Sequence, residues 1–160
     1  MTAEAVTLTA VVDAALAGTA RELFREYARA IATDLEYQGF HAELAALPAP
    51  YVPPKGTLLI AQVGPRVAGC VALRPLDDSI GEMKRLYVRP GYRSLGLGQR
   101  LVEAVIRAAR QAGDHELRLD TLPGMAAAQA LYRRLGFREI PPYNRTHLPG
   151  TRFYALSLAG

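Results

Sequence analysis

The sequence is short of several features that would define a function class. It has one cysteine, Cys70, among 160 residues and no tryptophan. A single cysteine excludes an internal disulfide framework and a zinc site built from several cysteines. No apolar run reaches the ~18 residues of a membrane-spanning helix, and residues 1–12 lack the basic start of a signal peptide. We therefore expect a cytoplasmic protein with no metal and no membrane attachment.

Acidic residues are outnumbered, and the surplus of basic residues is local. The chain has 19 Lys and Arg against 15 Asp and Glu, which gives a formal net charge of +4. Residues 81–100 contain five basic residues and one acidic residue, so this window accounts for the whole surplus. A local surplus predicts a small anionic ligand. No nucleic-acid motif is present and +4 is modest, so we expect no nucleic-acid partner.

Hydrophobic periodicity predicts alternating strands and helices along the whole chain. Strands are expected at 6–12, 57–63, 67–73, 80–88, 116–121, 137–140 and 152–158. Helices are expected at 14–32, 41–47 and 125–135, with another that starts near the glycines at 96 and 98 and ends before Gly113. This order predicts one mixed α/β (α+β) domain over residues 1–160, with a central sheet of six or seven strands.

One predicted strand breaks its alternation. Within residues 80–88, Ile80, Leu86 and Val88 share one parity and Met83 has the other. A β-bulge between them would return these apolar side chains to one face and leave backbone groups unpaired. We therefore expect an irregularity beside Lys84 and Arg85.

A glycine-rich segment between a predicted strand and a predicted helix reads RSLGLG, residues 93–98. Glycines let a ligand approach the backbone, and several N–H groups can then point into one space. The start of a helix adds partial positive charge, which favours a phosphate. The segment is neither a dinucleotide fingerprint nor a P-loop. A connector that only shapes a turn is the alternative.

Two segments resemble one known family. Residues 82–98, EMKRLYVRPGYRSLGLG, resemble the acetyl-CoA-binding core of the GNAT N-acetyltransferase superfamily, and residues 130–137, ALYRRLGF, resemble a later motif of that family. The order of predicted elements over residues 6–158 is also similar to the family's. The resemblance implies a GNAT-like, mostly antiparallel sheet flanked by about four helices. It also implies acetyl-CoA as co-substrate.

The resemblance implies a binding role for two stretches of backbone. The backbone around Leu86, Tyr87 and Val88 would pair with the pantetheine arm and polarise the thioester carbonyl. The pyrophosphate would be held by the backbone of the segment that follows, which consists of Arg93, Ser94, Leu95, Gly96, Leu97, Gly98, Gln99 and Arg100. Met125 stands where many members have an asparagine, and Gln129 could replace that contact.

Two side chains are implied for the chemistry. Tyr132 matches a tyrosine that protonates the departing thiolate, and a phenol with a pKa of about 10 is protonated at pH 7. Glu82 matches a position where some members carry a general base, although a carboxyl with a pKa of about 4.3 would need burial or a water to act on an amine. The alternatives are helix-to-sheet packing for Tyr132 and a surface ion pair with Lys84 or Arg85 for Glu82.

These motifs predict acetyl transfer from acetyl-CoA to a primary amine by direct attack in a ternary complex. The alternative is an acyl-CoA-binding sensor or partner module without turnover. The acceptor is expected to be a small-molecule or peptide amine, and a homodimer is left open. Residues 1–50 carry seven acidic and three basic residues, which would suit a cationic amine.

Overall fold

The computed structural model describes residues 4–159, in which seven strands form one sheet with the order β1-β2-β3-β4-β5-β7-β6. Every neighbouring pair is antiparallel except β4 and β5, which are parallel. The prediction of a mostly antiparallel sheet of six or seven strands is confirmed. The strands are β1 (Val6–Ala10), β2 (Thr57–Val63), β3 (Arg66–Pro75), β4 (Ile80–Val88), β5 (Glu116–Thr121), β6 (Arg138–Ile140) and β7 (Arg152–Ser157).

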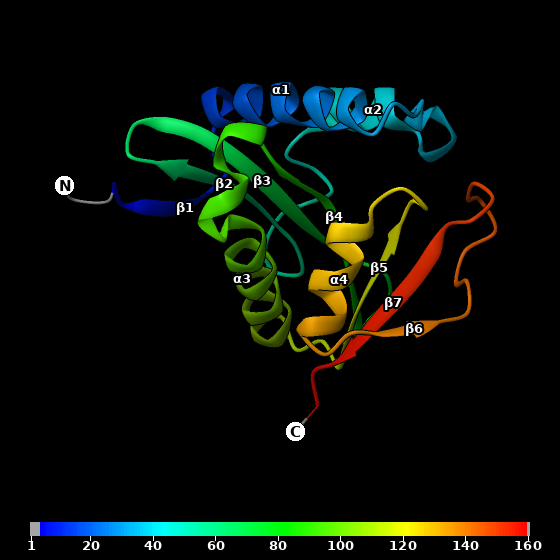
Figure 1. The fold of residues 1–160 in the computed structure, drawn as a ribbon. Helices are drawn as coiled ribbons and strands as arrows, with labels where there is room; N and C mark the ends of the chain where they lie inside the picture. The colour runs from blue at the N-terminus through cyan, green and yellow to red at the C-terminus, as the bar shows by residue number, and fades with distance from the viewer. Residues whose placement is uncertain (1–3, 160) are drawn as a thin grey trace.

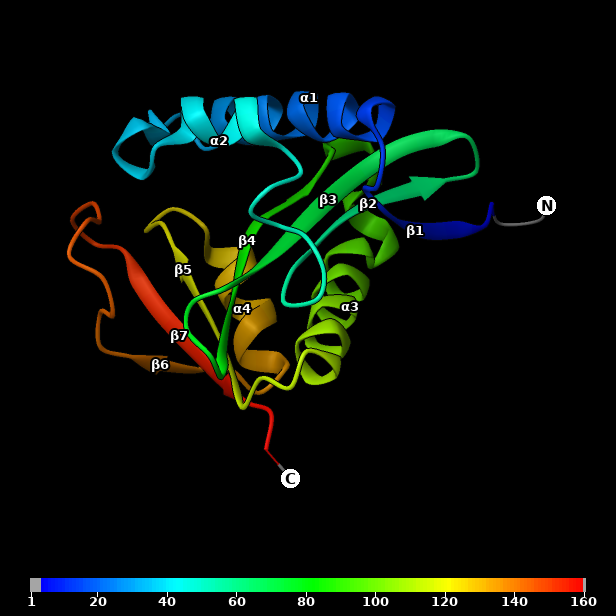
Figure 2. The same ribbon diagram turned by 180° about the vertical axis from the view of Figure 1, so that it is seen from behind.

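Helices cover both faces of the sheet. Figures 1 and 2 show α1 and α2 on one face and α3 and α4 on the other. Within residues 4–159, no helix combines the length and apolar character needed to cross a membrane. The helices are α1 (Ala14–Ala30), α2 (Phe40–Ala46), α3 (Leu97–Gln111) and α4 (Ala126–Arg134), with two short 3-10 helices, η1 (Leu35–Gln38) and η2 (Pro90–Leu95), that periodicity did not predict.

Each face of the sheet has its own hydrophobic core, and β3 contributes alternately to both. Val71 and Leu73 pack on the side of α3 and α4, whereas Cys70 and Ala72 pack on the side of α1 and α2. This alternation follows from the two-residue period of a strand. Cys70 is fully buried and belongs to the core on the side of α1 and α2.

The parallel pairing of β4 with β5 is short. It consists of three residue pairs, from Ile80 opposite Glu116 to Glu82 opposite Arg118. Beyond these pairs the two strands diverge toward the side of α1 and α2, as both ribbon views show (Figures 1 and 2). The edges of β4 and β5 that face each other beyond this point form no ladder, so backbone groups there are free for another partner.

A β-bulge interrupts β4 where the alternation breaks. Cys70 lies opposite Tyr87 and Ala72 lies opposite Lys84, so Val71 opposes both Leu86 and Arg85. Arg85 has a φ of +61°, in the left-handed region that L-residues seldom adopt. The extra residue brings Met83 and Leu86 to the same core, and the predicted irregularity is confirmed.

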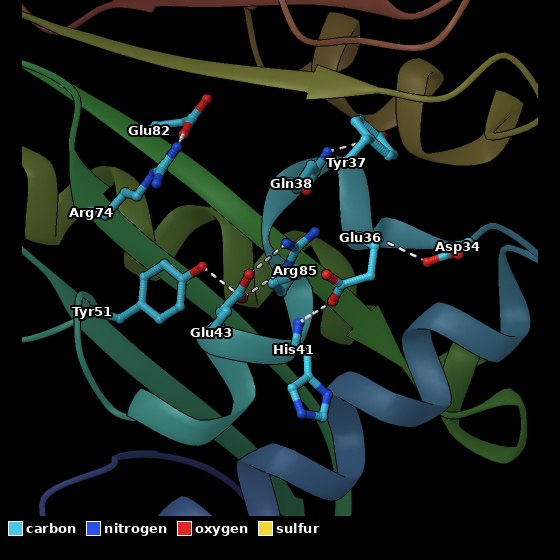
Figure 3. Close-up of polar contacts among 10 residues, drawn as sticks. All are labelled: Asp34, Glu36, Tyr37, Gln38, His41, Glu43, Tyr51, Arg74, Glu82 and Arg85. Atoms are coloured by element: carbon cyan, nitrogen blue, oxygen red, sulfur yellow. Dashed lines mark hydrogen bonds and ion pairs between the residues drawn. The ribbon is translucent and has the colours of Figure 1, made fainter.

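The side chain at the bulge is held by a buried ion pair. The Arg85 guanidinium donates from Nη2 to Glu43 Oε1 at 2.6 Å and from Nε to Glu43 Oε2 at 2.9 Å. Tyr51 donates a further hydrogen bond to Glu43 Oε2 at 2.7 Å (Figure 3). The side chains of Arg85 and Glu43 are only 2% and 10% exposed. Two buried charges stabilise a structure only when they form an ion pair with each other. The pair of Arg85 and Glu43 therefore holds α2 against the bulge.

Replacing Glu43 should therefore destabilise the fold strongly. Glu43→Ala leaves the Arg85 guanidinium buried without a counter-charge, and we expect a loss of about 3–5 kcal/mol in the free energy of unfolding. Glu22→Ala is the matched control, because the Glu22–Arg29 pair is exposed and should cost at most about 1 kcal/mol. Urea unfolding of both variants measures the difference, and equal effects would contradict the assignment.

The same variant should reveal a pH dependence of stability. Burial alone would raise the pKa of Glu43, but the hydrogen bonds and charge of Arg85 hold that pKa below its ordinary 4.5. A lowered folded-state pKa stabilises the fold above the ordinary value, and this contribution is lost as the pH falls through the folded-state pKa. The difference in stability between wild type and Glu43→Ala should narrow below about pH 4.5, as urea titrations at several pH values will show.

Candidate active site

Three cavities meet where β4 and β5 diverge. A long groove of about 670 Å³ runs beside β4 and α4. A polar cavity of about 180 Å³ lies on the face of the sheet that carries α1 and α2. A junction cavity of about 30 Å³ lies between them, and it shares Leu86 with the groove and Lys84 and Asp120 with the polar cavity. The split in the sheet therefore connects two binding spaces.

The groove is bordered by the open edge of β4. Leu86, Tyr87 and Val88 all line it, as does Gly98 in the first turn of α3. Because β4 has no ladder with β5 beyond Glu82, an extended ligand arm can pair with this edge as an additional strand would. Five of the predicted binding residues line this groove: Leu86, Tyr87, Val88, Arg93 and Gly98.

The start of α3 presents free backbone donors. Its first helical hydrogen bond runs from Arg100 N to Gly96 O at 3.2 Å, so the N–H groups of the preceding turn lack an acceptor within the helix. Gly96 precedes the helix with a φ of +71°, and no side chain caps this end. An uncapped helix start of this kind suits an anion.

The predicted glycine loop is more regular than expected. Residues 93–95 belong to η2, and Leu97 already begins α3. Arg93 donates from Nε to Val88 O at 3.0 Å, which ties η2 to the end of β4. The side chain of Leu97 is fully buried. The remaining residues of the predicted binding segment do not line the groove, and they are Ser94, Leu95, Gly96, Leu97, Gln99 and Arg100.

Tyr132 lies at the junction cavity. It comes from α4, on the opposite face of the sheet from the polar cavity, and its ring packs 5.7 Å from Phe137 and 6.1 Å from Tyr154, measured between ring centroids. The residue is 4% exposed, and burial raises the pKa of its hydroxyl. Tyr132 therefore packs between the helix and the sheet, as the alternative prediction had it. It also lines the junction cavity, where a proton donor would have to lie.

Glu82 is buried and engaged. Its Oε1 accepts from Arg74 at 2.8 Å (Figure 3), and its Oε2 accepts from the Tyr143 hydroxyl. Burial alone would raise the pKa of Glu82, but Lys84, Arg74 and Tyr143 together hold that pKa below its ordinary value. The expected surface ion pair with Lys84 or Arg85 is corrected here, since the residue is 1% exposed and its partner is Arg74. The role of Glu82 as general base stays a prediction, and Glu82 does not line the three cavities.

A second carboxylate lies at the split, and sequence reasoning missed it. Asp120 on β5 lines both the junction cavity and the polar cavity. Its charge acts on four tyrosines around the site, including Tyr132 and Tyr143, whose pKa values it helps to raise. The alternation of β5 places Asp120 on the solvent side of its strand, but only the parallel pairing with β4 brings it beside Lys84.

Lys84 faces Asp120 across the split. It lines the junction cavity and the polar cavity, and no ion pair or hydrogen bond of its ammonium group is present within residues 4–159. Burial lowers the pKa of Lys84 more than the nearby Glu82 and Asp120 raise it. A half-buried cation without a close partner is costly, which makes this position a candidate for ligand binding.

The positive surplus of residues 81–100 is only partly available to an anionic ligand. Arg85 is paired with Glu43, and Arg89 is paired with Glu26 at 2.7 Å, which holds α1 against the end of β4. Lys84 faces the polar cavity, and only Arg93 of the five lines the groove. The net charge of this window therefore indicates where the ligand-binding region lies, but ion pairs within the fold neutralise part of that charge.

The start of α4 also differs from the expectation. Gln129 donates from Nε2 to Leu122 O at 3.1 Å and is 7% exposed. It therefore stabilises the turn between β5 and α4 rather than reaching the groove. Met125, which stands at the position expected to be asparagine, lines the groove with its apolar side chain.

Comparison with known proteins agrees with this geometry. The acetyltransferase (GNAT) family matches residues 17–137. An N-acetyltransferase of Schizosaccharomyces pombe is 37% identical over 86% of this chain and 85% of its own length. A GNAT-family acetyltransferase structure from Staphylococcus aureus superposes with a TM-score of 0.79 at 21% identity, covering 96% of this chain and 99% of that one. A GNAT-family acetyltransferase structure from Elizabethkingia anophelis, with acetyl-CoA bound, gives a TM-score of 0.62 at 18% identity, over 95% and 97% of the two chains.

Proposed function

The chain belongs to the acetyltransferase (GNAT) family, and from that premise we propose that it transfers the acetyl group of acetyl-CoA to a primary amine by direct attack. One observation carries this proposal: the junction cavity shares lining residues with both the groove beside the open edge of β4 and the polar cavity, and it has Tyr132 and Asp120 in its wall. Acetyl-CoA supplies an activated acetyl thioester, and the residues of the chain bind, orient and exchange protons.

The size of the groove and the backbone groups at its border support acetyl-CoA as the ligand. Its volume of about 670 Å³ lies in the range of small-molecule sites. The free edge of β4 offers backbone groups to the amides of the pantetheine arm, and the uncapped start of α3 offers N–H groups to the pyrophosphate. The acetyl-CoA bound by the Elizabethkingia anophelis acetyltransferase, whose fold this chain shares, supports the same ligand here.

Tyr132 is the proposed proton donor to the leaving thiolate. Its pKa is raised by burial, so the hydroxyl keeps its proton at neutral pH. A thiol with a pKa of about 8.5 is the stronger acid, but the bond to sulfur breaks heterolytically, and a hydrogen bond or proton from Tyr132 stabilises the charge that develops. Packing against Phe137 and Tyr154 holds the ring in place.

Asp120 is the proposed proton acceptor for the amine. It borders the junction cavity from the polar side, whereas Glu82 already accepts hydrogen bonds at both carboxylate oxygens. As the amine nitrogen bonds to the acetyl carbon and the C–S bond breaks, Asp120 takes a proton from nitrogen and Tyr132 gives one to sulfur. The junction cavity, about 30 Å³, has room for a water that could carry the first proton.

Binding of acetyl-CoA is the first test. At about 100 times its dissociation constant, the ligand should stabilise the fold by about 2.7 kcal/mol. Gly98→Leu extends a side chain from a position that lines the groove. We therefore expect this variant to bind acetyl-CoA at least tenfold more weakly, which corresponds to a loss of about 1.4 kcal/mol in binding free energy. Gly18→Leu is the control, because Gly18 lies in α1 with open space around it. Equal thermal stabilisation of both variants would rule out the groove as the binding site.

Removal of the Tyr132 hydroxyl should slow the chemical step. Tyr132→Phe is expected to lower kcat by roughly 10²–10⁴ without changing the affinity for acetyl-CoA. Tyr154→Phe is the matched control, since Tyr154 packs in the same aromatic group but lies outside the three cavities. An unchanged kcat in Tyr132→Phe would show that Tyr132 is not the proton donor and that its role is packing.

Two carboxylates compete for the role of base, and paired variants separate them. Asp120→Asn should lower kcat/KM by roughly 10²–10⁴ with little change in melting temperature. Glu82→Gln should mainly lower the melting temperature, because it leaves Arg74 without its buried partner. Steady-state kinetics and thermal melts of both variants give the answer. A large kinetic loss in Glu82→Gln, with normal turnover in Asp120→Asn, would identify Glu82 as the base.

A further inference from the structure

The polar cavity has two charged side chains in its wall that form no ion pair within residues 4–159. The charged side chains in its wall are Glu43, Arg74, Lys84, Arg85 and Asp120. Arg85 is paired with Glu43, and Arg74 is paired with Glu82. Within residues 4–159 this leaves one lysine and one aspartate, Lys84 and Asp120, without an ion-pair partner. A cavity with one free charge of each sign complements a ligand that carries both.

Lys84 is the free positive charge. It lies one position before the bulge on β4, opposite Ala72, so its neighbour on β3 offers no counter-ion. Lys84 lines both the junction cavity and the polar cavity. A cation that is partly removed from water gains most from an anionic ligand that accepts its hydrogen bonds directly.

Gln38 adds an acceptor on the same wall. Its Oε1 is buried and has no hydrogen-bond partner within residues 4–159, while its Nε2 donates to the Tyr37 hydroxyl at 3.0 Å (Figure 3). Gln38 lines the same two cavities as Lys84 and Asp120. A buried carbonyl oxygen without a partner is rare, and a rotation of the Gln38 side chain would bring this oxygen to an amine in the cavity.

We propose that the acceptor is an α-amino acid, with its carboxylate on Lys84 Nζ and its amine between Gln38 Oε1 and Asp120. This inference rests on the proposed acetyl transfer, and it names the class of substrate. All three residues border both the junction cavity and the polar cavity, so the carboxylate and the amine must lie close together on the acceptor. The polar cavity, about 180 Å³, is less than a third of the volume of the groove, which suits a small acceptor.

The charge balance of the first 50 residues does not oppose this inference. Their seven acidic residues led to the expectation of a cationic acceptor. Four of the seven are neutralised by arginines in the folded chain, and these pairs are Glu4 with Arg66, Glu22 with Arg29, Glu26 with Arg89, and Glu43 with Arg85. The acidic surplus of this segment is therefore mostly absent from the cavity, and a polyamine would meet the free charge of Lys84.

The test compares matched acceptors that differ in one charge. Each L-amino acid is assayed against its C-terminal amide, with spermidine as a cationic acceptor, at saturating acetyl-CoA and with detection of the free thiol. The wild-type protein should acetylate its preferred amino acid with a kcat/KM roughly ten- to a hundredfold above that of the amide, the range of one charge-assisted hydrogen bond. This comparison needs no variant.

Substitution of Lys84 assigns the preference to one residue. Lys84→Met should raise KM for the amino acid and leave KM for its amide unchanged, so the preference disappears, and Lys84→Arg should retain it. Lys55→Met is the matched control, because Lys55 is the other lysine of the chain and its Nζ donates to Ala112 O at 2.6 Å. Melting temperatures with and without acetyl-CoA show that each variant folds and binds.

Two results would overturn the inference while the proposed function stands: faster acetylation of amides or spermidine than of amino acids, or an unchanged preference in a folded Lys84→Met. Absence of acetylated product from every amine, although acetyl-CoA binds, would overturn the proposed function and this inference with it. Preference for the amino acid in wild type and its loss in Lys84→Met alone would confirm the inference.

Discussion

The structure depends on the early end of the parallel pairing between β4 and β5. After the pair Glu82 and Arg118 the two strands separate, and the sheet becomes open at its centre. The separation is maintained from both sides: the buried pair of Arg85 with Glu43 holds β4 toward α2, while a six-residue antiparallel ladder holds β5 to β7. Because a continuous sheet has no passage between its faces, this gap is what allows groups on opposite faces to meet.

Charge in this chain is divided between holding the fold and recognising ligands. Arg85 and Arg89 look equivalent to Lys84 and Arg93 in the sequence, yet the first two are consumed by Glu43 and Glu26. The Arg85 guanidinium is 2% exposed and must have a fixed counter-ion, whereas Arg89 is 32% exposed and is paired because Glu26 of α1 lies against it. Of the basic residues in 81–100 that form no ion pair within residues 4–159, Lys84 lines the polar cavity and Arg93 lines the groove. The net charge of a segment indicates the region of a binding site, and the ion pairs within the fold determine which of its charged side chains can bind a ligand.

Local patterns predicted the elements well, because each depends on residues that are neighbours in sequence. The bulge was expected from the parity of Met83 and Leu86, and the glycine after α3 was expected at Gly113, which has a φ of +86°. The site was predicted only in part. Asp120 was missed because its place beside Lys84 depends on which strands pair, and the partner of Arg85 lies 42 residues earlier in the chain. Such pairings join residues that are far apart in the sequence and depend on the order of strands in the whole sheet, so local sequence patterns cannot predict them.

The arrangement at the gap also bears on the order of chemical events. A route through an acetylated enzyme needs an accessible nucleophile, and the cysteine of this chain does not provide one. Cys70 is fully buried, its Sγ donates to Arg85 O at 3.4 Å, and burial raises the pKa of its thiol. Tyr132 and Asp120, in contrast, border the junction cavity from opposite faces of the sheet. With Tyr132 as the proposed donor on one side and Asp120 as the proposed acceptor on the other, the arrangement suits a single transfer in which both substrates are present, because each proton would move on its own side of the gap.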